Sequence, residues 1–361
     1  MTAAERILVV QTSFLGDVVL TTPLIAALRR RFPDARLAVL CTPRGREILA
    51  GNGDIDEIIV LEKKRDGGRH ANLLKKAAEL RARGFTIAVS PHKSFRTALL
   101  LFLARIPLRI GFRQSAGWFL YHRRVERDAR LHDVERNLSL LDALGVDPGD
   151  CARAPQIEAT ASAREAVARV FQELGIESER MIVGVNPGSV WRTKRWTIEG
   201  YAELCRALER RYNAQIVLFA GPEDRDIVDA IAARADCGAV SLAGRVGLSE
   251  LAAAIERCRV FVTNDSGPMH VAVARGVPVV AVFCATTPSL GFFPYSSRAV
   301  VVEKELACRP CGAHGGRRCP LGTDDCMRLV KAEDVLAGVE RLLGECGMPA
   351  AETYRPQSIA V

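Results

Sequence analysis

The segment Thr263–His270, with the sequence TNDSGPMH, carries the clearest chemical signal in the chain. It lies between two apolar runs, and this pattern predicts a strand, a short polar loop and a helix. A helix that begins at such a loop directs backbone N–H groups and the positive end of its dipole at one point, where a diphosphate can bind. Ser266 is placed to cap the helix, and Gly267 lets a ligand approach the backbone. The same pattern also fits an ordinary capped strand–helix junction without a ligand.

A second loop with suitable residues is Thr12–Asp17, which directly follows the first predicted strand. Asp17 lies near the start of the next helix, where the helix dipole favours the ionised carboxylate. An ionised carboxylate can accept the proton of an attacking hydroxyl, and an Asp with the ordinary pKa of about 3.9 is ionised at neutral pH. The alternative is that Asp17 only caps the helix. Pro23 must lie in the first turn of a helix or kink it.

The segment Asn186–Trp196, NPGSVWRTKRW, offers a third group of candidates. Ser189 suits a loop that faces phosphate, and Lys194 can neutralise a leaving diphosphate. The spacing is not that of GxxxxGK[ST], which disfavours a Walker-type ATPase. Trp191 and Trp196 beside cations leave stacking on nucleobases open, and a packed loop with a few exposed cations is the other interpretation.

Charged side chains follow two other predicted strands. Glu223 comes after the run ending at Phe219, a position from which acidic residues often hold ribose hydroxyls. A carboxylate at a helix entry is the simpler alternative. Lys93 and Arg96 follow a strand in the first half of the chain and can bind an anionic acceptor, unless they belong to the solvated surface.

Four cysteines gather near the C-terminus: Cys308, Cys311, Cys319 and Cys326. The CxxC at their start is typical of a structural zinc site, and His314 could replace one ligand. The two later spacings are unusual for zinc. Reduced thiols or a disulfide pair are therefore the alternatives.

The bulk properties limit the class of protein. Of 361 residues, 48% are hydrophobic and 25% charged, the composition of a globular chain with about two domains. The net charge of +8 favours a polyanionic partner such as nucleic acid, an acidic lipid surface or a phosphorylated glycan, with a solvated basic surface as the alternative. No apolar run approaches the ~20 residues of a membrane span. The N-terminus predicts a strand where a signal peptide would stand, and most of the eleven cysteines should be reduced, so we expect a cytosolic protein.

Apolar strand-like runs alternate with amphipathic helical runs along the chain, as in parallel sheets covered by helices. The segment 145–155 interrupts this alternation. We therefore predict an α/β protein of two doubly wound domains, residues 1–155 and 156–340, with a C-terminal tail at 341–361. Ligands of such sheets bind beyond the carboxyl ends of the strands, so we expect the substrate in a central cleft between the domains. The predicted strands are Arg6–Gln11, Arg36–Cys41, Glu57–Leu61, Thr86–Ser90, Arg109–Phe112, Met181–Val185, Gln215–Ala220, Ala239–Ser241, Val260–Thr263 and Val277–Phe283.

Together these segments resemble the bacterial lipopolysaccharide heptosyltransferases of glycosyltransferase family 9, most closely the heptosyltransferase II type. The match follows the family's order over nearly the whole chain. The residues that carry it are Thr12–Pro23, Asn186–Ser189, Thr193–Trp196, Asn264–His270 and Cys308–Met327.

The resemblance implies a GT-B type fold, with an N-terminal Rossmann-like domain for the acceptor and a C-terminal one for ADP-heptose. It implies an inverting transfer, without a required metal or cofactor, of L-glycero-D-manno-heptose from ADP-heptose to the lipopolysaccharide inner core. The heptosyl-Kdo2-lipid A acceptor would receive the second heptose. Asp17 matches the family's general base, and Lys93 and Arg96 are weaker candidates for acceptor binding. The implied donor-binding residues are Ser189, Lys194, Glu223, Asp265, Ser266, Gly267 and His270.

Two other functions remain open at this point. A heptosyltransferase of type I or III, or another ADP-heptose-dependent transferase, would keep the donor and change the acceptor. A basic nucleic-acid-binding module with a zinc knuckle would use the positive charge, the clustered cysteines and the two tryptophans. The charge is spread along the chain and aromatic residues make up only 6%, which disfavours that module. The expected partners are therefore the nucleotide-sugar donor, the anionic lipopolysaccharide core and, transiently, the cytoplasmic face of the inner membrane, with no nucleic acid.

Overall fold

The computed structural model describes residues 5–62, 69–177, 179–344 and 356–360. The chain forms two compact units, Met1–Glu158 and Ala159–Val361. The division falls three residues after the one expected from the sequence, because the segment that ends the first unit packs on that unit. The Gln156 N–H donates to Thr22 Oγ1 over 3.0 Å, and the Glu158 backbone lies where a Cβ on Gly51 would stand.

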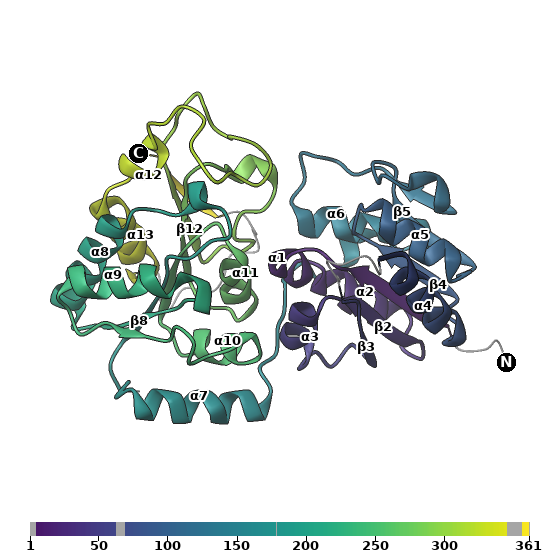
Figure 1. Cartoon of the computed structure of the whole chain (residues 1–361), viewed down its shortest axis with the longest axis horizontal. Helices are drawn as coiled ribbons and strands as arrows, with labels where there is room; N and C mark the ends of the chain where they lie inside the picture. The colour runs from purple at the N-terminus through teal and green to yellow at the C-terminus, as the bar shows by residue number, and fades with distance from the viewer. Residues whose placement is uncertain (1–4, 63–68, 178, 345–355, 361) are drawn as a thin grey trace. The chain divides into compact units, whose positions relative to one another are not determined.

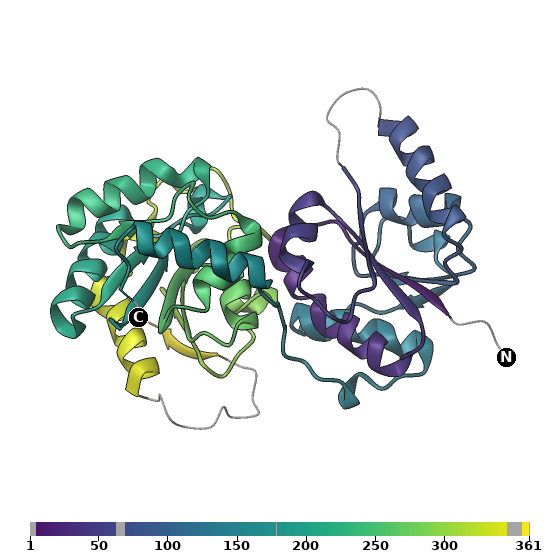
Figure 2. The same cartoon turned by 90° about the horizontal axis from the view of Figure 1, so that it is seen from below.

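The first unit contains a sheet of six parallel strands in the order β3-β2-β1-β4-β5-β6. Helices cover both faces, with α4 and α5 on one and α2, α3 and α6 on the other (Figures 1 and 2). The strands are β1 (Arg6–Gln11), β2 (Arg36–Cys41), β3 (Glu57–Val60), β4 (Ile87–Ser90), β5 (Leu108–Phe112) and β6 (Arg123–Val125). The helices are α1 (Leu15–Val19), α2 (Thr22–Arg31), α3 (Pro43–Leu49), α4 (Arg69–Ala82), α5 (Phe95–Leu103) and α6 (Asp133–Ser139), with a short 3-10 turn η1 (Trp118–Leu120).

The second unit repeats this plan with one more strand. Its parallel sheet has the order β13-β12-β11-β10-β7-β8-β9, with α8, α9 and α13 on one face and α7, α10 and α11 on the other. The strands are β7 (Ile182–Asn186), β8 (Gln215–Leu218), β9 (Val240–Ser241), β10 (Val260–Asn264), β11 (Val279–Phe283), β12 (Ala299–Glu303) and β13 (Gln357–Ala360). The helices are α7 (Ala161–Glu173), α8 (Ile198–Tyr212), α9 (Arg225–Ala235), α10 (Leu248–Ile255), α11 (Gly267–Ala274), α12 (Asp325–Arg328) and α13 (Ala332–Gly344).

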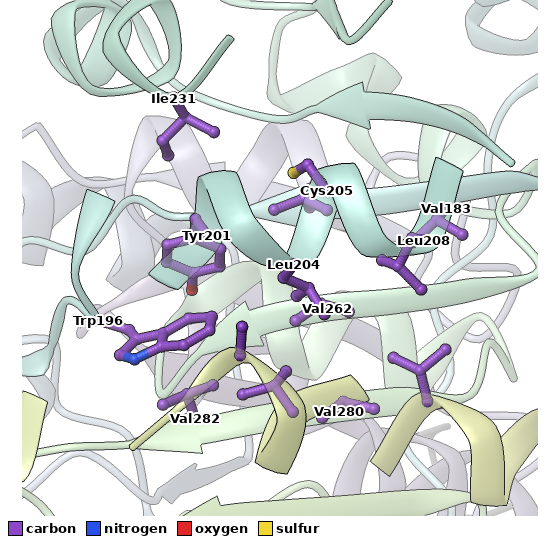
Figure 3. Close-up of a cluster of buried hydrophobic side chains, with 14 of the residues drawn as sticks. Val183, Trp196, Tyr201, Leu204, Cys205, Leu208, Ile231, Val262, Val280 and Val282 are labelled. Atoms are coloured by element: carbon purple, nitrogen blue, oxygen red, sulfur yellow. The ribbon is translucent and has the colours of Figure 1, made fainter. Parts of the chain in front are cut away.

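The sequence explains why these strands lie in the centre of each unit. The central strands β10 and β11 read VFVTN and VVAVF, and every residue of both is buried. Such continuous apolar runs are typical of parallel strands that helices cover on both faces. Figure 3 shows the core on the α8 side of the second sheet, where Leu204 and Leu208 lie over Val183, Val262 and Val280.

The predicted alternation of strands and helices is confirmed, with local differences. The helix expected to start near Asp17 is two helices, α1 and α2, and Pro23 lies in the first turn of α2. The segment 341–361 was expected to be a tail. It instead contains the end of α13 and strand β13, which pairs with β12. The part of the tail from 345 to 355 lies outside the described residues. No helix in the described part of the chain is both long and apolar enough to cross a bilayer.

Candidate functional site

The predicted site residues follow strands at the point where each sheet reverses its strand order. In the first unit this point lies between β1 and β4, and in the second between β7 and β10. Loops that leave two such strands in opposite directions open a crevice at the carboxyl ends, where doubly wound sheets bind their ligands. Asp17 follows β1 and Lys93 follows β4, while Lys194 follows β7 and Asp265 follows β10.

Lys194 and Asp265 form a buried ion pair in the second unit. Lys194 Nζ lies 2.6 Å from Asp265 Oδ2, and only 14% and 7% of the two side chains are exposed. Thr286, just beyond β11, donates its hydroxyl to the same carboxylate oxygen over 2.7 Å. An ammonium group has three N–H donors, so this pair leaves Lys194 two donors for a bound anion.

His270 lies beside this pair, in the first two turns of α11. Its side chain is 4% exposed, and Nδ1 has no hydrogen-bond partner among the described residues. Burial, and then the positive charge of Lys194, lowers the pKa of His270 to about 4, although Asp265 opposes this shift. The imidazole is therefore neutral at physiological pH. An unpaired buried nitrogen is costly in the free protein, which is the condition expected of a ligand-binding atom.

Two buried asparagines join the loops after β7 and β10. Asn264 Oδ1 accepts the Trp196 N–H and the Tyr201 hydroxyl, each over 2.9 Å, and Asn264 Nδ2 donates to the Pro187 carbonyl over 2.7 Å. Asn186 Nδ2 donates to the hydroxyls of Thr263 and Ser266 over 3.1 and 3.2 Å. Each asparagine is the last residue of its strand, so the sheet itself fixes both loops.

The start of α11 differs in one respect from the sequence-based expectation. Ser266 occupies the N-cap position, but its side chain makes no capping hydrogen bond. Its hydroxyl lies 3.2 Å from both Asn186 Nδ2 and Thr263 Oγ1 instead. The Ser266 hydroxyl therefore contacts the ends of β7 and β10, and it does not cap the N–H groups at the start of α11.

The loop after β7 is also held from the side of β8. Arg195 donates through Nε and Nη2 to the Ser189 carbonyl over 2.8 and 2.6 Å, and it pairs with Asp224 over 3.0 Å. A Cβ on Gly188 would lie 2.3 Å from Asp224 Oδ2, so a larger residue there would displace the carboxylate that pairs with Arg195. Ser189 is buried, and Glu223 is exposed at the carboxyl end of β8, the position expected for a group that meets a ribose.

Trp196 belongs to the core and not to a binding surface. Its side chain is 3% exposed, its ring lies 4.8 Å from that of Tyr201 (Figure 3), and its indole N–H donates to the Val330 carbonyl over 3.0 Å. A buried indole cannot stack on a nucleobase. The nucleic-acid interpretation of Trp196 is therefore wrong, because its ring is part of the hydrophobic core of the second unit.

Asp17 lies in the first unit, three residues into α1. Its Oδ2 accepts the Phe14 N–H over 3.1 Å, so it does cap the helix backbone, as one interpretation of the sequence proposed. Burial, followed by the negative charge of Asp133, raises the pKa of Asp17 to about 6. The sequence-based assumption of an ordinary pKa is therefore wrong, because the loss of solvent outweighs the favourable helix position.

A group of charges on other elements surrounds Asp17. Asp133, in the first turn of α6, pairs with Arg127 over 2.7 Å and with Arg136 over 3.6 Å. Asn137 Nδ2 ties α6 to α1 by donating to the Leu20 carbonyl over 3.1 Å. Lys93 interacts with the same charges. Partial burial of its side chain, and then the positive charge of Arg127, lower the pKa of Lys93.

Arg96 lies in the first turn of α5, whose N-cap is Ser94. Its backbone N–H donates to the Ser94 hydroxyl over 3.2 Å. Its predicted role in acceptor binding stays a prediction.

The four clustered cysteines lie on a loop that packs against the loop of Lys194. Thr193 N–H donates to the Gly316 carbonyl over 3.1 Å, and Gly316 N–H returns a bond to Thr193 Oγ1 over 2.8 Å. The thiols are free, with Cys308 exposed, Cys311 and Cys319 half-buried and Cys326 buried. In the described ranges no three or more His, Cys, Asp or Glu side chains are arranged to hold a metal ion. The zinc site stays a prediction from the cysteine spacing.

The structure adds residues that the sequence-based reasoning did not single out: Asn186, Asn264, Thr286, Arg127 and Asp133. A signal was present for the two asparagines, since each ends an apolar strand directly before a polar turn. No spacing in the sequence marks Asp133 or Arg127, because only the fold brings them to α1.

Comparison with known proteins places this arrangement in one family. The model of glycosyltransferase family 9 (heptosyltransferase) matches residues 73–318, more than half of the chain. Lipopolysaccharide heptosyltransferase 2 of Salmonella typhimurium is 29% identical over 82% of this chain and 88% of its own length. Lipopolysaccharide heptosyltransferase 3 of Escherichia coli is 27% identical over 91% of this chain and 96% of its own length.

Solved structures agree with the sequence relatives. A family 9 glycosyltransferase from Veillonella parvula has a TM-score of 0.83 and 28% identity, and it covers 94% of this chain and 97% of its own. The E. coli ADP-heptose lipopolysaccharide heptosyltransferase II has a TM-score of 0.75 and 26% identity, with 94% and 99% covered. The chain therefore belongs to glycosyltransferase family 9, the heptosyltransferases, and has their two-unit α/β fold of the GT-B type.

Proposed function

We propose that this heptosyltransferase transfers L-glycero-D-manno-heptose from ADP-heptose to heptosyl-Kdo2-lipid A, as the second heptose of the lipopolysaccharide inner core. The observation that carries the proposal is the buried Lys194–Asp265 pair with the unpartnered His270 at the switch point of the second unit. Its similarity to an E. coli ADP-heptose heptosyltransferase II supports the donor.

The second unit supplies the groups that hold the donor and its leaving group. Negative charge grows on the diphosphate as ADP departs, and a preorganised cation is the strongest means of stabilising it. Lys194 and the N-terminus of α11, at Ser266 and Gly267, supply this charge without a metal ion. Ser189 faces the phosphates, His270 donates from its neutral ring, and Asp265 holds Lys194. The exposed carboxylate of Glu223 takes the ribose hydroxyls.

The first unit supplies the base. An acceptor hydroxyl forms a bond to the anomeric carbon, while the bond from that carbon to the diphosphate oxygen breaks and ADP leaves. Asp17 accepts the hydroxyl proton, and this single displacement inverts the anomeric configuration. Lys93, with the Arg127 beside it, suits an anionic acceptor, because the two cations extend the positive charge next to Asp17.

The assignment of the acceptor rests on the sequence rather than on the chemistry of the site. Relatives of both type 2 and type 3 match at similar identity. The type 2 acceptor is favoured by the overall resemblance to heptosyltransferase II, which includes the cysteine segment Cys308–Met327. We place the reaction in the cytoplasm, at the membrane surface that carries the lipid-anchored acceptor.

A panel of truncated acceptors tests this assignment. Purified protein is incubated with ADP-heptose and, separately, Kdo2-lipid A, heptosyl-Kdo2-lipid A or a longer inner core, and heptose addition is followed by mass spectrometry. We expect addition to heptosyl-Kdo2-lipid A alone. Transfer to Kdo2-lipid A would assign type I, transfer only to the longer core would assign type III, and no transfer to any acceptor would refute the proposal.

Replacement of the base tests the mechanism. Asp17→Asn should lower kcat by about 10²–10⁴-fold, the usual contribution of general base catalysis, and leave ADP affinity unchanged. The carboxylate is the active form, so kcat/KM of the native enzyme should fall as the pH drops through about 6, the pKa of Asp17. Asp133→Asn should move this acidic limb to lower pH, because Asp133 raises that pKa. A kcat near that of the native enzyme in Asp17→Asn would remove Asp17 from this role.

Replacement of the donor cation gives a separate test. Lys194→Met should raise the KM for ADP-heptose and weaken ADP binding by tenfold or more, about 1.4 kcal/mol, since the charge facing the diphosphate is lost. Lys194→Arg should recover part of the affinity. Arg192→Gln is the matched control, because Arg192 lies in the same loop but pairs with Asp324 and has a half-exposed side chain. Equal ADP affinity in Lys194→Met and Arg192→Gln, measured by calorimetry, would contradict the assignment.

A further inference from the structure

The outward face of helix α5 is apolar and uncovered. The helix reads FRTALLLFL, and its inner face, which includes Ala98 and Leu101, is fully buried. Phe95 and Phe102 lie two turns apart on the opposite side and are 46% and 47% exposed. Leu99 lies between them on the same stripe. A helix that is apolar on both sides is expected to be covered on both, yet among the described residues Phe95 and Phe102 stay nearly half exposed.

A second segment extends the apolar face. Trp118 and Phe119, in η1, are 46% and 59% exposed. The Phe119 ring lies 6.4 Å from that of Phe95 and 6.0 Å from that of Trp118. Gly117 makes this possible, because a Cβ there would stand 2.5 Å from the Cβ of Ala98. We refer to Phe95, Phe102, Trp118 and Phe119 as the aromatic patch.

The aromatic patch holds most of the exposed Phe and Trp rings in the part of the chain that the structure describes. Among the described residues, five Phe and Trp side chains are exposed, and the fifth is Phe14 beside Asp17. Scattered exposed apolar residues need no explanation, whereas a contiguous group marks an interaction surface.

The segments that carry the aromatic patch have charges of one sign only. From 91 to 125 the sequence contains seven Lys and Arg residues and no Asp or Glu. Arg124 lies over the Trp118 ring at 5.2 Å. Exposed arginines on the same segments include Arg105, directly after α5, and Arg113 and Arg123, which flank η1 along the chain. An apolar surface bordered by cations is complementary to a partner that has an anionic surface and an apolar interior.

We propose that the aromatic patch and these arginines dock the protein on the anionic surface of a lipid bilayer. Aromatic rings partition into the headgroup region, and nearby Lys and Arg side chains are attracted to an anionic membrane. Helix α5 begins at Phe95, two residues after Lys93, at the carboxyl edge of the first sheet. Docking here would therefore hold the acceptor-binding edge of the first unit close to a lipid-anchored substrate. The binding itself needs neither donor nor acceptor, so it stands or falls apart from the proposed function.

Other occupants fit the same surface less well. A second copy of the chain would bring two arginine-rich surfaces together, and like charges oppose such contacts. A nucleic acid would suit the arginines and rings, but the aliphatic Leu99 stripe offers it neither stacking nor hydrogen bonds.

Vesicle sedimentation with the full-length protein tests the proposal. Vesicles of phosphatidylcholine with 30% phosphatidylglycerol are compared with vesicles of phosphatidylcholine alone, at low and high salt. We expect binding to the anionic vesicles that weakens with salt. The Trp118→Ser/Phe119→Ser variant should lower partitioning by about tenfold or more. The Arg105→Gln/Arg124→Gln variant should lower it on anionic vesicles only.

Matched controls separate this surface from general properties of the chain. Leu321→Ser removes an apolar side chain that is 65% exposed elsewhere, and Arg130→Gln removes an arginine whose side chain is 89% exposed. Both should bind vesicles like the native protein, and all variants should keep the native melting temperature and ADP affinity. Absent vesicle binding, or equal losses in patch and control variants, would overturn the proposal. So would a patch-dependent shift to a dimer, or patch-dependent binding of single-stranded RNA, without vesicle binding.

Discussion

The side-chain amide of Asn264 is the contact on which the donor half of the site depends. Its oxygen accepts hydrogen bonds from Trp196 and Tyr201, and its nitrogen donates to Pro187, with no exposure to solvent. These three bonds tie the loop that carries Lys194 to the strand that carries Asp265. Because a buried polar group without its partner costs more than the bond itself contributes, the two loops hold one arrangement. Lys194 is thereby positioned before any ligand arrives.

In the first unit, the pKa of Asp17 depends in the same way on residues that are distant in the sequence. The position of Asp17 near the start of α1 favours its ionised carboxylate. Burial and the neighbouring Asp133 disfavour the ionised form, and together they outweigh the helix position. Asp133 is itself held by Arg127 and Arg136, so its negative charge is fixed beside α1. A carboxylate with a pKa of about 6 is a stronger base than an ordinary Asp and still ionised at pH 7.

Much of the architecture follows from the sequence. The predicted bounds of β1 and β2 are those observed, because each strand is a clear apolar run. Strand β6 was missed, since its sequence RRV has neither alternation nor an apolar run. Strand β13 lies in the segment expected to be a tail, and it forms only by pairing with β12. The loops around Lys194 and Asp17 could be located from strand ends. The roles of Asn264 and Asp133 could not, because long-range contacts create them.

The most direct test of the central claim is the ADP affinity of Asn264→Ala by titration calorimetry. We expect a loss of tenfold or more, about 1.4 kcal/mol, although the three hydrogen bonds of the Asn264 side chain described above all join it to other residues of the chain. Tyr201→Phe removes one of the three bonds and should cost less, which controls for a general loss of packing. Circular dichroism confirms that both variants are folded. A folded Asn264→Ala variant with native ADP affinity would contradict the account.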